Sequence, residues 1–455
     1  MSLSNTVGNG ESDMKRNLIL ITLDEVRPDH LSCYGYDKMK TANIDRIAEE
    51  GVLFETCITA SNFTPVSHAS ILTGVYPNKH GTRDAYSPIQ RKSIAEILKE
   101  QAFATAAYVG NPVLSIKLDF NKGFDHYEEQ GIEDPLHGAF KIEVAQGEKI
   151  ELHQVRKGGR GTFGNWWIER AIDWIKKQSN QFFLWGHVFD THRVGEKRMF
   201  YNRWIKPGEL SDFDYYDAKI KCVDERFIGL LIKALKDLGI YDDTTLVLMS
   251  DHGTNLADHP IPLGSFSQNW ALGPFPEHSS LYDHDIRAFC IMKDRDLPKG
   301  RRVKGIVRTV DITPTILDLL GIRTDVEFDG VSLIPFIEKG ESTQEEAYVE
   351  NMWEDRVPGL IQALRGKRYK LIRNLSAGVE ALYDLENDPK EASNMLCNVD
   401  GFTLPEREKE ELLRNTRRKL NEMISRKEPI TEKAPLKGKE REEIDKRLRQ
   451  LGYLG

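Results

Sequence analysis

Short, nearly continuous apolar runs recur along the chain and alternate with segments of helical periodicity. Such runs are typical of strands that helices cover on both faces, and they lie at residues 17–24, 102–110, 182–190, 244–253 and 287–292. Helical spacing is found at 41–51, 91–100, 166–178, 215–239 and 309–321. Strands alternating with helices predict an α/β fold with a doubly wound, mostly parallel sheet.

The pattern changes after about residue 340, where short mixed segments predict a smaller antiparallel sheet. Residues 404–455 are rich in charge with helical spacing, which is typical of solvated helix faces. We therefore expect a disordered N-terminus (1–16), a catalytic domain (17–340) and a C-terminal α+β subdomain with a helical tail (341–455). Residues 125–162 have no clear period, which indicates an insertion or an active-site loop region.

The stretch 62–74 reads NFTPVSHASILTG, with Thr64 directly before Pro65 and an apolar helical segment after them. Because proline favours the first helical position, Thr64 is predicted to be the N-cap. A hydroxyl there faces the positive end of a helix dipole, where anions bind. A Thr-Pro pair alone is usually no more than a helix cap.

Acids stand where three predicted strands end: Asp24, Asp190 and Asp251, the last followed by His252. The carboxyl ends of parallel strands meet at one sheet edge, which is where α/β proteins bind ligands. Carboxylates mixed with imidazole suit Zn, Mn or Mg rather than a thiolate-binding metal. These residues therefore predict a divalent-metal site beside the Thr64 hydroxyl.

Composition narrows the class of protein. The chain has 455 residues, 40% of them apolar, and a net charge of -8, which argues against a nucleic-acid binder. Five scattered cysteines without a CxxC spacing favour free thiols in a reducing compartment, and Cys57 in particular is predicted to be a buried thiol. No secretory signal and no apolar run of membrane-spanning length is visible. We expect a cytoplasmic enzyme with no membrane or nucleic-acid partner; homo-oligomerisation is left open.

The order of several motifs resembles that of the alkaline phosphatase superfamily, in its sulfatase-like branch. The matching pieces cover nearly the whole chain: LITLDEVRPDHLSCYGY (20–36), TPVSHASILTGVYPNKHG (64–81), FDTH (189–192), LVLMSDHG (246–253), HSSLYDHDIR (278–287) and LYDLENDPKEASN (382–394). The resemblance implies a metal-assisted nucleophile that attacks a sulfate or phosphate ester. Asp24, Thr64, Asp251 and His252 fall on the metal-site positions, and Thr64 also falls on the nucleophile position.

The chain departs from the sulfatase pattern at the nucleophile. Sulfatases carry a Cys or Ser in a Cys/Ser-X-Pro-X-Arg signature, which is oxidised to formylglycine, whereas this chain has Thr64, with His68 at the signature Arg. A Lys-Trp-His motif that grips sulfate should fall near 109–113, where the chain reads VGNPV. The family's phosphodiesterase, phosphonate hydrolase and phosphotransferase branches do use Thr. These departures favour phosphorus over sulfur.

Further site residues are implied by position. His192 falls where the family contacts the substrate's charged oxygens or protonates the leaving group, and His278 falls where sulfatases often have an anion-binding Lys. Alternatively, Asp190, His192 and His278 hold a second metal, as in the two-zinc branch. Glu25 occupies the second position of the usual Asp-Asp pair, so its role as a ligand stays open.

Other charged residues near the motifs are assigned more ordinary roles. Arg27 and Asp29 are predicted to form an ion pair within their loop. His259 is a weaker candidate for the pocket, and His187 and His284 are predicted to be core or surface residues. Surface positions are favoured for four cations: Arg193, Lys197, Arg198 and Arg203.

The sequence thus predicts a metal-dependent hydrolase of small anionic phosphate esters, either phosphodiesters or phosphonate monoesters, acting through phospho-Thr64. The predicted catalytic residues are Thr64, His192 and His278, with His192 and His278 also binding substrate. The predicted cofactor is one or two divalent ions (Zn, Mn, Mg or Ca). The alternatives are a sulfatase that uses unmodified Thr, a phosphotransferase to an alcohol, and a non-catalytic binding protein with this fold.

Overall fold

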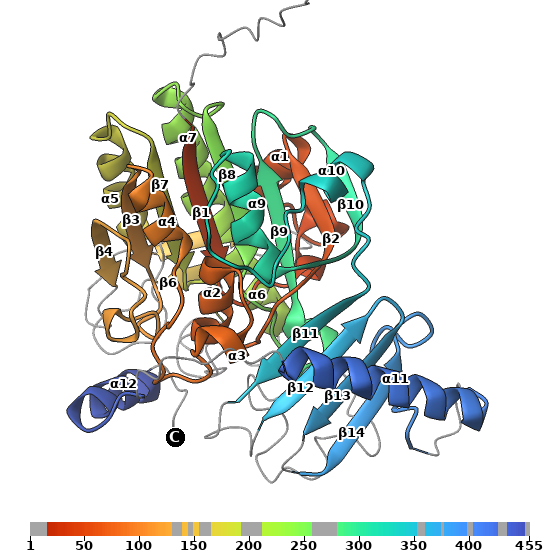
Figure 1. The fold of residues 1–455 in the computed structure, drawn as a ribbon. Coiled ribbons are helices and arrows are strands. Elements are labelled where there is room, and N and C mark those ends of the chain that lie inside the picture. The colour runs from red at the N-terminus through yellow and green to blue at the C-terminus, as the bar shows by residue number, and fades with distance from the viewer. Residues whose placement is uncertain are drawn as a thin grey trace, which may run out of the picture.

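A computed structural model describes residues 16–129, 139–143, 149–153, 165–192, 212–256, 280–352, 360–374, 377–397, 404–425 and 435–450. Its largest element is an eight-stranded sheet in the order β10-β2-β9-β8-β1-β7-β3-β4 (Figure 1). The strands are β1 (Asn17–Leu23), β2 (Val52–Ile58), β3 (Ala104–Val109), β4 (His126–Glu129), β7 (Phe182–Val188), β8 (Thr244–Ser250), β9 (Arg287–Lys293) and β10 (Arg301–Arg308). All neighbours are parallel except β9, which is antiparallel to β2 and β8. The predicted mostly parallel α/β fold is confirmed.

Helices cover both faces of this sheet because its central strands are apolar on both sides. One face packs against α2 (Thr64–Thr73), α4 (Ile94–Glu100), α9 (Ile312–Leu319) and α10 (Ile334–Lys339). The other face packs against α1 (Ala42–Glu49), α5 (Asn165–Lys176), α6 (Asp212–Val223) and α7 (Gly229–Asp237). Every residue of β1, β7 and β8 is buried, as a continuous apolar run predicts. Short helices α3 (Pro77–His80) and α8 (Asp283–Ile286) complete the fold, with 3-10 turns at Pro28–His30, Ser32–Tyr34, Ile116–Leu118 and Thr309–Asp311.

Some elements differ from the sequence prediction. Strands β2 and β10 were not expected, since polar residues interrupt both runs, as Glu55 does in β2. Residues 125–162, expected to be loop, contain β4 and a hairpin of β5 (Ala139–Glu143) and β6 (Lys149–His153). The helix predicted over 215–239 is interrupted by a π-helical turn at Asp224–Ile228.

The C-terminal region forms a separate four-stranded antiparallel sheet, as predicted. It consists of β11 (Glu346–Asn351), β12 (Ile361–Gly366), β13 (Tyr369–Asn374) and β14 (Val379–Asp384). Helix α11 (Glu406–Ser425) lies across it and buries Leu420 (Figure 1).

The last helix, α12 (Lys439–Gln450), lies apart from α11 near the N-terminus of α2. It buries Ile444 and Leu448 against Phe63 and Val66, so its apolar positions pack rather than face solvent. None of the helices in the described ranges is long and apolar enough to cross a bilayer.

Candidate metal and nucleophile site

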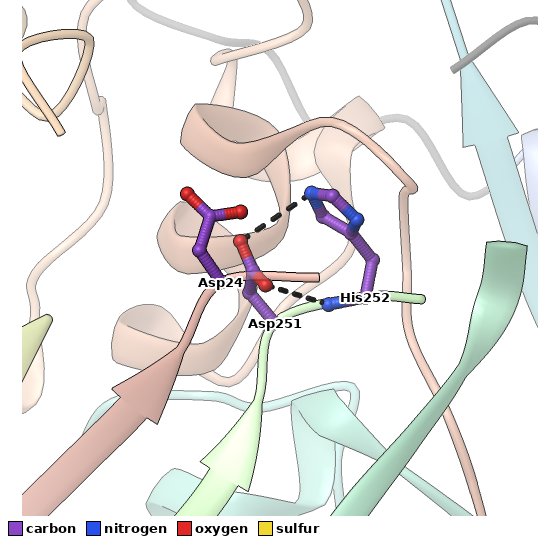
Figure 2. A group of neighbouring side chains, drawn as sticks. All are labelled: Asp24, Asp251 and His252. Atoms are coloured by element: carbon purple, nitrogen blue, oxygen red, sulfur yellow. Dashed lines mark hydrogen bonds and ion pairs between the residues drawn. The ribbon is translucent and has the colours of Figure 1, made fainter. Parts of the chain in front are cut away.

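Two acids meet where neighbouring parallel strands end. Asp24 follows β1 and Asp251 follows β8, and the last residues of these strands, Leu23 and Ser250, are paired. Figure 2 shows Asp24, Asp251 and His252 gathered at this edge, and all three are fully buried. The predicted convergence of strand-end acids is therefore present.

Asp251 is held by backbone groups through one of its two oxygens. Oδ1 accepts hydrogen bonds from the N–H groups of Glu25 (3.1 Å) and His252 (2.9 Å). Oδ2 is buried, has no hydrogen-bond partner among the described residues, and lies 3.4 Å from Nε2 of His252. Because an unsatisfied buried carboxylate oxygen is costly, this atom points to a missing ligand.

The turn after β8 fixes the orientation of the His252 ring. Nδ1 donates to the carbonyl of Gly253 (2.8 Å), which directs Nε2 toward Asp251. A Cβ at position 253 would lie 2.1 Å from the carbonyl oxygen of His284, so only glycine fits there.

Thr64 is the first helical residue of α2 rather than its N-cap. The cap is Phe63, with extended backbone (φ -123°, ψ 123°) and no side-chain cap bond. Pro65 is tolerated at either of the first two helical positions, so the sequence left the boundary one residue uncertain. The hydroxyl of Thr64, which caps nothing, lies 3.3 Å from Nε2 of His252.

These donors fit a divalent cation. Ligand atoms of Asp24, Asp251 and His252 lie within 4.8 Å of one another. Adjacent ligands on an ion with bonds of about 2.1 Å are roughly 3.0–3.4 Å apart, which matches the contacts of His252 Nε2 with Thr64 Oγ1 (3.3 Å) and Asp251 Oδ2 (3.4 Å). Oxygen and imidazole donors suit Zn, Mn or Mg.

Asp24 is oriented by two side chains that sequence reasoning did not connect with it. Nδ2 of Asn111 donates to its Oδ2 (3.2 Å), and Nε2 of His187 lies 3.2 Å from the same oxygen. Asn111 belongs to the VGNPV segment, where sulfatases should carry their anion-binding motif. His187 was predicted to be a core or surface residue, and it is buried. It also contacts the Asp24 carboxylate, which the sequence did not indicate.

Glu25 and His192 form a second pair beside Asp24. Oε1 of Glu25 lies 3.2 Å from Nε2 of His192, and both side chains are buried. The hydroxyl of Thr191 donates to the carbonyl of Asp24 (2.6 Å) and ties the FDTH turn to β1. Another group with metal-ligand spacing is formed by Asp24, Glu25 and His192. The sequence left the role of Glu25 open, and the structure places it beside His192.

Two further histidines lie behind the site. Burial, reinforced by the neighbouring His187, lowers the pKa of His68 to about 3. Burial likewise lowers the pKa of His187 to about 4, so both rings are neutral near pH 7. Burial raises the pKa of Asp251, but the nearby imidazole of His252 and the hydrogen bond from the N–H of Glu25 outweigh that effect and leave the pKa below its usual range.

Several smaller predictions can now be compared with the structure. Arg27 and Asp29 form the predicted ion pair (Nη2 to Oδ2, 2.7 Å). Cys57 is buried and free, as predicted, and Nε2 of His284 lies 3.3 Å from Oδ1 of Asp285. Asp190, two residues before His192, is buried. Residues 1–15 and six predicted site or surface residues lie outside the described residues: His278, His259, Arg193, Lys197, Arg198 and Arg203.

Comparison with known proteins agrees with this fold. The sulfatase family model matches residues 16–322, and the C-terminal model of N-sulphoglucosamine sulphohydrolase matches residues 275–419. An arylsulfatase of Clostridium perfringens is 24% identical and aligns over 84% of this chain and 90% of its own. An ulvan-active sulfatase of Formosa agariphila is 25% identical and aligns over 88% of this chain and 80% of its own.

Solved structures show the same architecture. One was determined with its substrate D-glucosamine-2-N,6-O-disulfate and has a TM-score of 0.70 at 18% identity, covering 92% of this chain and 100% of that chain. Another is the phosphonate monoester hydrolase of Agrobacterium radiobacter, with a TM-score of 0.69 at 19% identity, covering 93% and 100%. The fold is thus that of the alkaline phosphatase-like proteins in their sulfatase branch. Within that class, the chain belongs to the sulfatase family.

Proposed function

We propose that this protein is a metal-dependent hydrolase of phosphodiesters or phosphonate monoesters that uses the unmodified Thr64 as its nucleophile. The observation that carries the proposal is the position of the Thr64 hydroxyl, 3.3 Å from Nε2 of His252, a nitrogen that also lies 3.4 Å from the unsatisfied oxygen of Asp251. A divalent ion held by Asp24, Thr64, Asp251 and His252 would polarise the hydroxyl and offset negative charge on the transferring group.

Each of these residues has a separate role in the proposed reaction. Thr64 Oγ1 loses its proton to solvent and forms a bond to phosphorus as the bond from phosphorus to the leaving oxygen breaks. His192 supplies the proton that the leaving oxygen takes up, with Glu25 orienting its ring at 3.2 Å. Water then cleaves the ester of Thr64 and restores the hydroxyl. His278 is proposed to contact the same anion.

Phosphorus is favoured because formylglycine chemistry needs a Cys or Ser at the nucleophile position. An aldehyde hydrate releases sulfate by reforming its carbonyl, a route that an unmodified threonine does not have. The architecture of the phosphonate monoester hydrolase covers 93% of this chain, so the fold is compatible with phosphorus chemistry.

A sulfatase is the second candidate, because the curated relatives that match most of the chain are named sulfatases. A phosphotransferase is a variant of the first proposal, since an alcohol can replace water in the second step. Product analysis with added alcohols separates transfer from hydrolysis.

The test measures turnover of an aryl phosphodiester, an aryl phosphonate monoester and an aryl sulfate by protein reconstituted with Zn²⁺, Mn²⁺, Mg²⁺ or Ca²⁺ in turn. We expect a phosphorus ester to be the better substrate, and Thr64→Ala to lower its turnover by about 10³-fold or more. Thr73→Ala is the matched control, since that hydroxyl lies on the same helix and donates to the carbonyl of Ala69 (2.6 Å). Robust sulfate cleavage with negligible phosphoester cleavage would overturn the proposal.

A further inference from the structure

His68 lies one helical turn after Thr64 and touches the nucleophile's own backbone. Its Nδ1 lies 2.8 Å from the carbonyl oxygen of Thr64, and the ring is fully buried. A carbonyl only accepts, so Nδ1 carries a hydrogen and donates it. His68 therefore restrains the peptide group that carries the Thr64 side chain.

The other nitrogen of His68 is anchored on strand β1. Nε2 lies 2.9 Å from the hydroxyl of Thr22, two residues before Asp24. With Nδ1–H directed at the carbonyl, the neutral ring offers only the lone pair of Nε2, so Thr22 must donate to it.

The remaining contacts of the Thr22 hydroxyl are all longer than this one. Trp185 can only donate, and its Nε1–H lies 3.3 Å from Thr22 Oγ1. The same oxygen lies 3.2 Å from His187 Nδ1 and 3.4 Å from the carbonyl oxygen of Gly186. The contact with Nε2 of His68 is the shortest of these, so it is the one that takes the single proton of the Thr22 hydroxyl.

A second connection ties the same turn of α2 to β8. The hydroxyl of Ser67 donates to the backbone carbonyl of Asp251 (2.8 Å) and also lies 2.9 Å from the hydroxyl of Thr59. The first turn of α2 is thus attached both to the strand that carries Asp24 and to the residue that follows β8.

We propose that His68, anchored by Thr22, is a positioning residue that holds the first turn of α2 and sets the Thr64 hydroxyl against the metal ligands. This inference rests on the proposed function, in which Thr64 is the nucleophile. A neutral histidine with two directed hydrogen bonds does this at the position where the sulfatase signature has arginine. Displacement of a reacting group by about 1 Å can lower a rate by roughly 10²-fold. We therefore expect loss of the hydrogen bonds of His68 to lower kcat.

The test compares Thr22→Val, which keeps the branched shape and removes the hydroxyl, with Thr22→Ser, which keeps the hydroxyl. His68→Gln accompanies them. The control is His80→Gln, because His80 is also a buried histidine bonded to α2, through Ser70 (2.8 Å), but away from Thr64. The measurements are kcat and KM for an aryl phosphodiester, the Kd for Mn²⁺ and the thermal midpoint.

We expect Thr22→Val and His68→Gln to lower kcat by about 10- to 100-fold while KM and the Mn²⁺ Kd change less than about threefold. Thr22→Ser should restore kcat to within about threefold of the wild type, and His80→Gln should lower the thermal midpoint without lowering kcat.

Equal kcat in Thr22→Val, Thr22→Ser and His80→Gln would overturn the positioning role. If Thr64→Ala abolishes turnover while Thr22→Val does not change it, only this inference fails. If Thr64→Ala keeps full turnover, the proposed function fails with it.

Discussion

Two buried clusters of carboxylates differ in what balances them. Asp283, at the start of α8, receives hydrogen bonds from Arg365 (2.9 Å) and Lys370 (3.0 Å), and Lys370 also pairs with Glu391 (2.7 Å). Burial raises the pKa of Asp283, but these two cations outweigh it and hold that pKa well below its usual range. Charges there are matched within the protein.

At the metal site no lysine or arginine of the described residues contacts Asp251. Its Oδ2 lies 3.4 Å from Nε2 of His252 and 3.7 Å from Nδ1 of His68. In the first cluster the buried charges join β12 and β13 to α8, whereas in the second cluster a carboxylate oxygen of Asp251 is buried without a hydrogen-bond partner among the described residues. The comparison separates a structural cluster from a functional one.

The largest expected effect follows from replacing the carboxylate of Asp251, whose Oδ2 has no hydrogen-bond partner among the described residues. Asp251→Asn should lower phosphoester turnover by about 10³-fold or more, because both ion binding and placement of Thr64 depend on this turn. Addition of the ion should raise the thermal midpoint of the wild type, because an ion at 100 times its Kd stabilises the folded state by about 2.7 kcal/mol. Asp251→Asn should abolish this rise. Calorimetric melts with and without Mn²⁺ check this, and an unchanged ion-induced shift in Asp251→Asn would remove Asp251 from the site.

Asp283→Asn should behave in the opposite way. Removing one partner of a buried charge cluster typically costs about 3–5 kcal/mol of folding free energy. The variant should therefore unfold at lower urea concentration, yet keep the ion-induced shift in its melting. If it lost ion binding without losing stability, the two clusters would not be distinct.

Asp224 is an intermediate case, a buried carboxylate that is bonded to backbone rather than to a cation or an ion. It accepts from the N–H groups of Ile44 (2.8 Å) and Asn43 (3.1 Å), yet burial raises its pKa from 3.8 to about 6. The folded state therefore binds the proton more tightly, and the wild type loses stability as pH rises from 4 to 6. Relative to Asp224→Asn, this loss should approach 3 kcal/mol, at about 1.36 kcal/mol per pKa unit.

Urea unfolding of wild type and Asp224→Asn at pH 4, 5, 6 and 7 measures that difference. The gap between the two proteins should change below pH 6 and be constant above it. A gap independent of pH over the whole range would contradict the assignment.

The smallest effect is expected at Glu25. We expect the wild type to bind one ion per chain and Glu25→Gln to bind one as well, with turnover lowered by about tenfold or less through loss of the orientation of His192. Elemental analysis after dialysis gives the ratio. If the wild type binds two ions and Glu25→Gln binds one, Glu25 and His192 are ligands of a second metal ion.

Much of the fold followed from pattern, because β1, β7 and β8 are buried on both faces and therefore read as unbroken apolar runs. Strand β2 was missed since Glu55 interrupts its run, and the hairpin of β5 and β6 because its segment lacks a period. The acids at the strand ends followed from the same reasoning, since parallel strands end at one edge.

The remaining contacts of the site could not be predicted. Thr22, His68 and Trp185 meet only through strand pairing and the packing of α2, since Thr22 is 46 positions from His68 and 163 from Trp185. The one signal was His68 at the signature arginine, which the sequence presented as a departure without a partner. The start of α2 was also missed by one residue, since Pro65 fits either of two positions.

The central claim is that unmodified Thr64 forms a covalent bond to phosphorus, and acid quenching during turnover tests it most directly. Protein mixed with an excess of an aryl phosphonate monoester is quenched within the first turnovers and analysed by peptide mass spectrometry. We predict a phosphonyl ester on Thr64 that forms together with the first equivalent of released phenol and is absent from Thr64→Ala. An active enzyme with no adduct on Thr64, or a Thr64→Ala variant that turns over at the wild-type rate, would contradict the account.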